Sequence, residues 1–341
     1  MQNDRLINRR TFLSGAGVAA AGAIAPGLVS NALADKFPSK SVVGMMGFPP
    51  GGGLERSSRV FFPAWMKTLG ATRPFKFTFL PGAGGLIGFN KWKRSPADGH
   101  YIHLIPLNYI AWYFELEKVK WPRSEVSYVG SFFTDPDILL VKKDAKWNTI
   151  DEFVKDSKKS KKPLTVGVSS PFSSTHTVTT VLREMTGANI KTVFFKGGSK
   201  SRNAVAGGHV DATMAPYWSA MHVFGLVKAI GIFAEKNPAP DLWQPVPVNQ
   251  VLDVKIPTML EPYSAQVVTD VKRKNPDHYK KLVDSYRAMM DSKELKQTAK
   301  KQKMTRFLKY MSPAECEKFI KDYLVLLKDF KPAMERDIKG M

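Results

Sequence analysis

Two glycine-rich loops, each between an apolar segment and a helix-like segment, restrict the fold most strongly. The apolar "SVVGMMGF" leads into "PPGGG" at 49–53, and residues 54–70 then show helical spacing. The alternating "FKFTFL" leads into "PGAGGLIG" at 81–88, and a third apolar strand follows near 101–107. This strand–helix–strand order predicts parallel strands joined by right-handed crossovers, as in an α/β fold.

The alternation restarts after residue 137 and predicts a second α/β unit. The predicted strands of this unit are 137–145, 163–170, 190–195 and 210–216, with helices from 149 and 173. A proline-rich return segment follows at 235–249, and the rest of the chain is predicted to be helical. We therefore expect two lobes, 35–136 together with 250–341, and 137–249.

Residues 1–34 have the three parts of an export signal. Arg9 and Arg10 precede a weakly apolar stretch of Ala, Gly and Val, and "ALA" at 32–34 forms a small-x-small cleavage site. The paired arginines resemble a twin-arginine signal. An uncleaved membrane anchor is the alternative, and the glycines and Pro26 argue against it. We expect cleavage after "ALA" and a periplasmic mature protein.

Charge and cysteine content narrow the classes of partner and site. The net charge of +21 favours acidic partners without choosing among them, but the chain has no nucleic-acid-binding motif. The lysine cluster at 155–163 is interpreted as a solvated helix end. Cys316 is the single cysteine, which excludes an intramolecular disulfide and a cysteine-based metal site.

Neither glycine loop carries a complete nucleotide-binding motif. In the first loop, Gly53 and Leu54 occupy the Lys and Ser/Thr positions of a phosphate-binding loop, which excludes that motif. The second loop gives the partial dinucleotide pattern Gly82, Gly84 and Gly88, but no acidic residue lies on the next strand. An exported NAD(P)-dependent oxidoreductase is therefore kept as the alternative function.

The preferred interpretation of the two loops is anion capture by backbone N–H groups. Successive glycines can form a concave nest, and each loop leads to a helix N-terminus that favours a carboxylate. Loops that follow neighbouring parallel strands meet at the same edge of the sheet, where open α/β folds bind ligands. The pair therefore predicts a shared carboxylate site.

Five blocks in order resemble the tripartite tricarboxylate transporter receptors, also called Bug-type solute-binding proteins. They lie within residues 37–265 and are "FPPGGGLERSSRVFFPAWMKTLG", "FLPGAGGLIGFNKWKRSPADGHYI", "VGVSSPFSSTHTVTTVLREMTG", "VFFKGGSKSRNAVAGGHVDATMAP" and "IPTMLE". The resemblance implies a two-lobed periplasmic binding protein of the Venus-flytrap type, with a mixed or parallel sheet in each lobe and a hinge. It also implies a receptor that passes a small carboxylate to membrane permease subunits.

The resemblance further implies which residues contact the ligand. In the first lobe these are Phe48, Pro49, Gly51, Gly52, Gly53, Leu54, Ala83, Gly84 and Gly85. In the second lobe they are Ser169, Ser170, Ser173, Ser174, Thr175, His176, Lys196, Gly197 and Tyr217. The chain departs from the family pattern at Leu54, Glu55 and Leu86, where Thr, Asp and Asn are usual, and this suggests a ligand with a more apolar body.

The remaining candidate groups give no catalytic or metal site. His176 is predicted either to donate to an anion or to pack at the helix start, and Lys196 either to pair with a carboxylate or to be solvated. The six histidines have no partners at metal-ligand spacing, and Ser173 and Ser174 lack a nucleophile elbow. We expect a monomeric binding protein that is not an enzyme and has no cofactor or metal.

Overall fold

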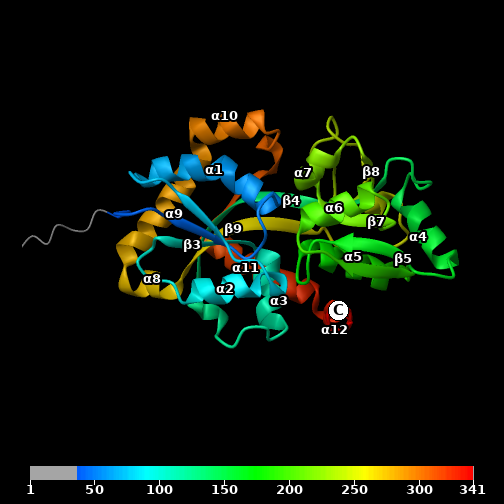
Figure 1. Cartoon of the computed structure of the whole chain (residues 1–341), viewed down its shortest axis with the longest axis horizontal. Coiled ribbons are helices and arrows are strands. Elements are labelled where there is room, and N and C mark those ends of the chain that lie inside the picture. The colour runs from blue at the N-terminus through cyan, green and yellow to red at the C-terminus, as the bar shows by residue number, and fades with distance from the viewer. Residues whose placement is uncertain (1–36, 341) are drawn as a thin grey trace, which may run out of the picture. The chain divides into compact units, whose positions relative to one another are not determined.

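One mixed sheet runs through residues 37–340, the part of the chain that the computed structural model describes (Figure 1). The order of the strands is β2 (Lys76–Phe79), β1 (Val43–Met46), β3 (Tyr101–Pro106), β9 (Leu260–Val268), β4 (Val126–Lys142), β7 (Ala212–Pro216), β5 (Leu164–Val168) and β6 (Ile190–Phe194). β10 (Leu308–Met311) and β8 (Val227–Ile232) also pair with β4. The predicted export signal lies outside the described residues.

The first lobe is built on β1, which pairs in parallel with β2 and β3, as the glycine-loop repeats predicted. Its helices are α1 (Gly53–Leu69), α2 (Leu86–Lys93), α3 (Leu107–Glu115), α8 (Thr269–Lys274), α9 (Pro276–Asp291), α10 (Lys293–Lys301) and α11 (Pro313–Leu326). The apolar face of α1 buries Phe61, Phe62 and Trp65 completely. Gly70 ends this helix in the left-handed conformation, at φ 73°.

The second lobe is built on β5, which pairs in parallel with β6 and β7. Its helices are α4 (Ile150–Lys159), α5 (Ser174–Thr186), α6 (Gly198–Ala206) and α7 (Tyr217–Ala220). Ser173 caps α5 because its side chain accepts a hydrogen bond from the backbone N–H of His176. Because β5 and β6 are parallel, the turns that follow them place the starts of α5 and α6 at the same edge of this sheet.

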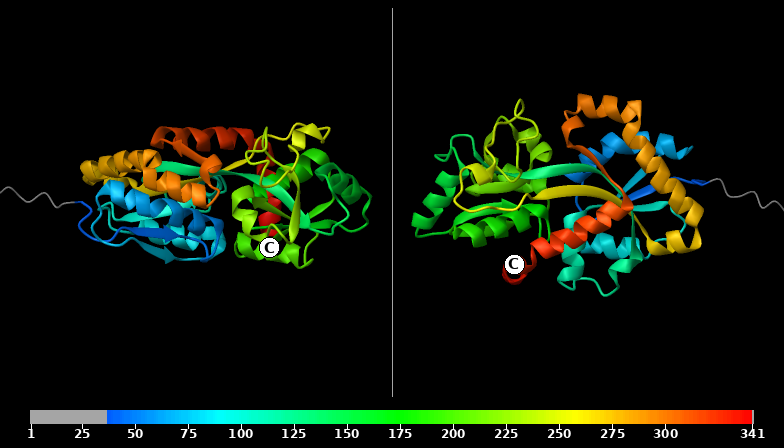
Figure 2. Two further views of the ribbon diagram at one scale, coloured as in Figure 1. Left: turned by 90° about the horizontal axis from the view of Figure 1, so that it is seen from above. Right: turned by 180° about the vertical axis from the view of Figure 1, so that it is seen from behind.

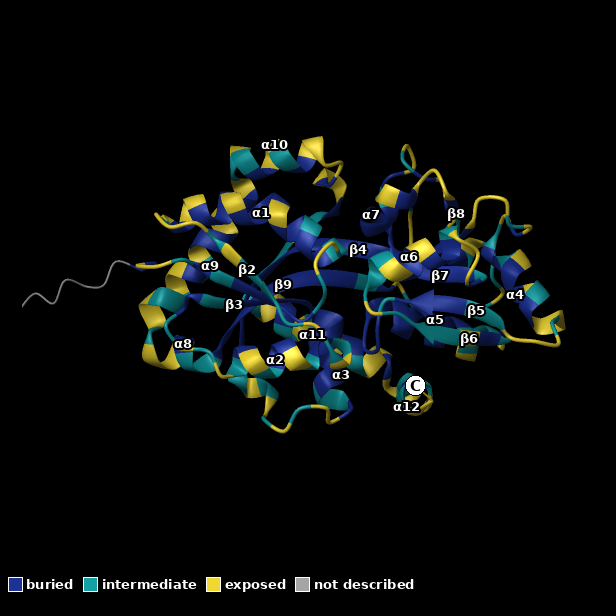
Figure 3. Ribbon diagram, viewed as in Figure 1, coloured by how far each residue is buried: buried dark blue, intermediate teal, exposed yellow. Residues whose placement is uncertain are grey.

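Two long antiparallel strands, β4 and β9, connect the lobes and are buried over most of their length (Figure 3). The sequence predicted a strand only from residue 137, whereas β4 begins at Val126. It also predicted helices throughout 250–341, and this was wrong for β9 and β10. Both faces of β9 are buried and include Glu261, Ser264 and Gln266, so the strand shows no apolar–polar alternation.

The lobe boundaries stay a prediction, since β4 passes through the expected boundary at 136/137 without a break. The C-terminal helix α12 (Lys331–Lys339) packs beside α5 of the second lobe, although it follows α11 of the first (Figure 2). Asp337 of α12 pairs there with Arg183 at 3.0 Å. Among residues 37–340, no helix combines the length and the apolar character that a membrane crossing requires.

Candidate functional site

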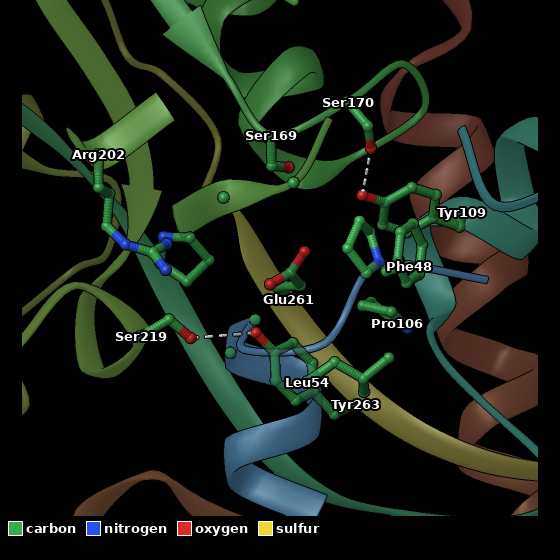
Figure 4. Close-up of a pocket in the computed structure, with 16 residues that line it drawn as sticks. Phe48, Leu54, Pro106, Tyr109, Ser169, Ser170, Arg202, Ser219, Glu261 and Tyr263 are labelled. Carbon is green, nitrogen blue, oxygen red and sulfur yellow. Dashed lines mark hydrogen bonds between the residues drawn. The ribbon is translucent and has the colours of Figure 1, made fainter. Parts of the chain in front are cut away.

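A cavity that is partly open to solvent lies between the two lobes (Figure 4). It is bounded by the first glycine loop, the end of β3 with α3, the turns before α5 and α6, the start of α7, and the first residues of β9. The residues that line it are Phe48, Pro49, Gly52, Gly53, Leu54, Pro106, Tyr109, Ser169, Ser170, Gly197, Gly198, Arg202, Pro216, Ser219, Glu261 and Tyr263.

The first glycine loop contributes both cavity wall and contacts between the lobes. Gly52 and Gly53 line the cavity at the start of α1, where backbone N–H groups lack partners within the helix. Gly51 lies at the rim, with φ +84°, and its carbonyl accepts a hydrogen bond from Ser199 of the second lobe at 3.0 Å. Glu55 accepts a hydrogen bond from the Gly51 N–H at 2.6 Å. The loop is thus held in place by its own helix and by the opposite lobe.

Arg202 is the cationic group of the cavity. It lies one turn into α6 and is 1% exposed, and its Nε has no hydrogen-bond partner among the described residues. Its Nη2 donates to Ser199 Oγ at 3.3 Å. Burial, with the charge of Arg56 in second place, lowers the pKa of Arg202 to about 10. A buried guanidinium with so few partners is suited to binding an anion.

Arg56 joins the lobes beside the cavity. Its guanidinium donates to the backbone carbonyl of Ser219 at 2.6 Å and to that of Gly51 at 3.0 Å. These carbonyls belong to opposite lobes, so Arg56 links them where the cavity closes.

Two acidic residues face each other across β4 and β9 next to the cavity. Asp135, opposite Glu261 in the strand register, accepts hydrogen bonds from the Trp218 N–H at 2.8 Å and from the N–H and Oγ of Ser219, both at 3.1 Å. Glu261 lines the cavity itself. Burial raises the pKa of each carboxyl to about 7. Asp135 thereby positions the start of α7, whereas Glu261 is open to a ligand.

In the Ser/Thr-rich turn before α5, some residues line the cavity and others hold the turn in shape. Ser169 and Ser170 line the cavity, and Ser170 Oγ lies 2.7 Å from the hydroxyl of Tyr109 on α3. Thr175 Oγ1 accepts a hydrogen bond from the Ser169 N–H at 3.0 Å, and Ser173 Oγ donates to the Ser170 carbonyl at 2.7 Å. Ser173 and Thr175 therefore shape the turn from behind and do not line the cavity.

Three other predicted contact residues do not line the cavity. Ser174 is completely buried. His176, also buried, has Nε2 3.2 Å from Asp337 of α12, and burial lowers its pKa. The hydroxyl of Tyr217 donates to the carbonyls of Ala239 and Trp243. Of the two alternatives for His176, the structure therefore agrees with packing near the start of the helix.

The second glycine loop lines an adjoining groove, called here the outer groove. This groove also includes Lys196, and it shares Phe48, Pro49, Ser170 and Gly197 with the cavity. The second loop therefore does not line the part of the cavity that holds Arg202. The reason is packing: Gly85 lies against Gly47, and the Gly84 carbonyl accepts a hydrogen bond from Tyr113 at 2.6 Å. Ala83, Gly84 and Gly85 thus face the groove.

The third glycine of the dinucleotide-like pattern has a packing role. A Cβ at Gly88 would lie 2.7 Å from the Cα of Gly47, because α2 packs directly on the first glycine loop. Packing on Gly47 thus accounts for Gly88, and the positive φ angles of Gly82 and Gly84, 135° and 62°, account for those two glycines without a dinucleotide.

Gly88→Ala is accordingly expected to destabilise the protein by about 2 kcal/mol, with a melting temperature several degrees lower, because overpacking forces the backbone to shift. Thermal unfolding followed by circular dichroism measures the effect. Gly225→Ala is the control, since nothing lies within 4 Å of a Cβ there. Equal melting temperatures for the two variants would contradict the packing role.

Sequence reasoning missed several lining residues, above all Arg202 and Glu261. It selected Lys196 as the cation, but Lys196 faces the outer groove. Arg202 follows the "KGG" turn by one helical turn, and this spacing was a usable signal. Tyr109, Ser219 and Tyr263 reach the cavity from segments far apart in sequence, which gave no local signal. No group of three or more metal-ligating side chains occurs within residues 37–340.

Comparisons with known proteins give a family and a fold for this chain. A family model described as "Tripartite tricarboxylate transporter family receptor" matches residues 71–330. The "UPF0065 protein in gbd 5'region" of Cupriavidus necator is 27% identical over 238 residues, which are 68% of this chain and 72% of that protein.

Two solved structures share the fold. MatC from Rhodopseudomonas palustris with bound malate has a TM-score of 0.73 at 18% identity, over 87% of this chain and 100% of MatC. An R. palustris protein with adipate has a TM-score of 0.76 at 16% identity, over 88% of this chain and 98% of that one. These superpositions confirm the predicted two-lobed α/β fold.

Proposed function

The chain belongs to the tripartite tricarboxylate transporter family of receptors, and from this we propose that it captures a small carboxylate between its two lobes for uptake by a membrane transporter. The observation that carries the proposal is Arg202, a buried and poorly paired guanidinium in the cavity between the lobes. The start of α1 at Gly53 lies in the same cavity, and its N–H groups and dipole favour an anion.

Two kinds of contact support binding by closure of the lobes. Ser199 and Arg56 make hydrogen bonds across the cavity rim, at 3.0 Å to Gly51 and 2.6 Å to Ser219. The continuous strands β4 and β9 run through both lobes and can serve as the hinge. A bound anion would therefore stabilise the arrangement in which both lobes contact it.

The proposed ligand contacts are the predicted residues that line the cavity, together with Arg202. They are Phe48, Pro49, Gly52, Gly53, Leu54, Ser169, Ser170 and Gly197. The outer groove with Ala83–Gly85 and Lys196 would serve as the entrance to the cavity. The receptor would act as a monomer in the periplasm, after removal of residues 1–34, and would deliver the ligand to permease subunits without chemical change.

The test is a thermal-shift screen of the purified protein with mono-, di- and tricarboxylates and with NADP. A ligand that binds only the folded state raises its stability by RT ln(1 + [L]/Kd), which is about 2.7 kcal/mol at 100 times Kd. We expect an acid to raise the melting temperature and NADP to leave it unchanged. A shift with NADP and none with any acid would refute the proposal in favour of the dinucleotide alternative.

A further inference from the structure

Two buried groups of opposite charge line the cavity without pairing with each other. Arg202 on α6 is 1% exposed and Glu261 on β9 is 5% exposed. No ion pair joins them within the described residues. The neutral hydroxyls of Tyr263 and Ser174 lie beside the Glu261 carboxyl, as do the buried carboxyls of Asp135 and Asp137. Burying a charge is costly unless a partner compensates it. The cavity thus offers one cationic and one anionic group to whatever occupies it.

Structural support of the fold does not account for Glu261. Its neighbour Asp135 receives three hydrogen bonds, which fix the start of α7. The hydroxyl of Tyr263 lies beside Glu261 and also pairs with Ser219 Oγ at 3.2 Å, so the group it brings to Glu261 is a neutral one. Figure 4 shows the Glu261 carboxylate in the middle of the lining residues, between Arg202 and Tyr109.

We propose that the ligand is a zwitterion, whose carboxylate binds Arg202 and the start of α1 and whose cationic nitrogen faces Glu261. This inference rests on the proposed function. The two ends of such a ligand would supply the partners that both buried charges lack. The aromatic rings of Phe48, Tyr109 and Tyr263 also suit a cation.

The other walls restrict the body of the ligand. Leu54, Pro49 and Pro106 are apolar and line the cavity beside the charged groups. They favour an aliphatic or aromatic body between the two ends. A dicarboxylate would instead place its second carboxylate against the like charge of Glu261, which disfavours it. The simplest ligand of the inferred class is therefore an apolar amino acid.

The experiment is titration calorimetry at pH 8, above the pKa of about 7 to which burial raises Glu261, so that this carboxylate is ionised. The probes are the apolar amino acids, the matching acid of each without its amino group, and adipate. The zwitterions are expected to bind about 100-fold more tightly than the matching acids, since a site built for a polar group rejects an analogue that lacks it.

Glu261→Gln is expected to remove most of this preference and to improve binding of adipate. Glu294→Gln, which removes a surface acid paired with Lys67 at 3.4 Å, is the control and should change neither affinity. If acids bind equally well with and without the amino group, or if Glu261→Gln leaves the ratio unchanged, the zwitterion is excluded and the carboxylate receptor stands. If no acid and no zwitterion binds, both proposals fail.

Discussion

Replacing Arg202 with methionine is expected to weaken carboxylate binding by about 100-fold or more, because truncating one partner of a buried charge pair costs roughly 2–5 kcal/mol. The stability of the folded protein should not decrease. Arg202 is buried without adequate partners, and replacing a buried charge by an apolar side chain of similar size is often neutral or stabilising. Calorimetry with the acids identified in the thermal-shift screen measures the loss, and the melting temperature of the free protein measures stability.

Arg202→Lys is the matched variant for this prediction. It keeps the charge but loses the planar, bidentate geometry, so its affinity should fall between those of the wild type and Arg202→Met. Lys196→Met, in the outer groove, removes a cation without touching the cavity and should have a small effect. Affinity within threefold of the wild type for Arg202→Met would contradict the assignment of Arg202 as the anion-binding group.

Gly53→Ala is expected to block closure of the lobes and to lower affinity by a comparable factor. A Cβ at this position would lie 2.2 Å from Ser219 Oγ and 2.8 Å from Ser219 Cβ, both in the opposite lobe. The first lobe itself should fold normally, since alanine is favourable at the first residue of a helix. Affinity from calorimetry and the ligand-induced change in the radius of gyration, from small-angle scattering, are the measurements.

The two neighbouring positions give this prediction its controls. In Gly52→Ala the new Cβ would lie 3.8 Å from the Pro49 carbonyl oxygen, which is ordinary van der Waals contact, so this variant should bind nearly normally. Ser219→Gly, combined with Gly53→Ala, removes the clashing side chain and should restore part of the affinity, as expected for residues in contact. Equal affinities for Gly53→Ala and Gly52→Ala would show that closure does not bring Gly53 against Ser219.

The parts of the fold that the sequence predicted are those with local signals. The helix predicted over residues 54–70 ends at Gly70, and the helix predicted from residue 173 is capped by Ser173, as these residue types favour. The connecting strand β9 was missed because its residues are buried on both faces, so that no alternation distinguishes it. Pairing between strands distant in sequence decided its conformation.

The residues of the site that the sequence predicted are likewise those with a local signal. Gly52, Gly53 and Ser170 belong to loops whose composition is unusual, and the structure brings them to one cavity. Arg202 and Glu261 are ordinary charged residues in the sequence, and their importance arises from burial against the opposite lobe. Whether a charged side chain can bind a ligand depends on its burial and its neighbours, and these are set by the tertiary fold.

A crystal structure of the protein with a carboxylate from the thermal-shift screen tests the central claim most directly. The account predicts the ligand between the lobes, with a carboxylate oxygen within hydrogen-bonding distance of the Arg202 guanidinium and of backbone N–H groups at Gly52 and Gly53. Ligand found in the outer groove against Gly84 and Lys196, with the cavity at Arg202 empty, would contradict it.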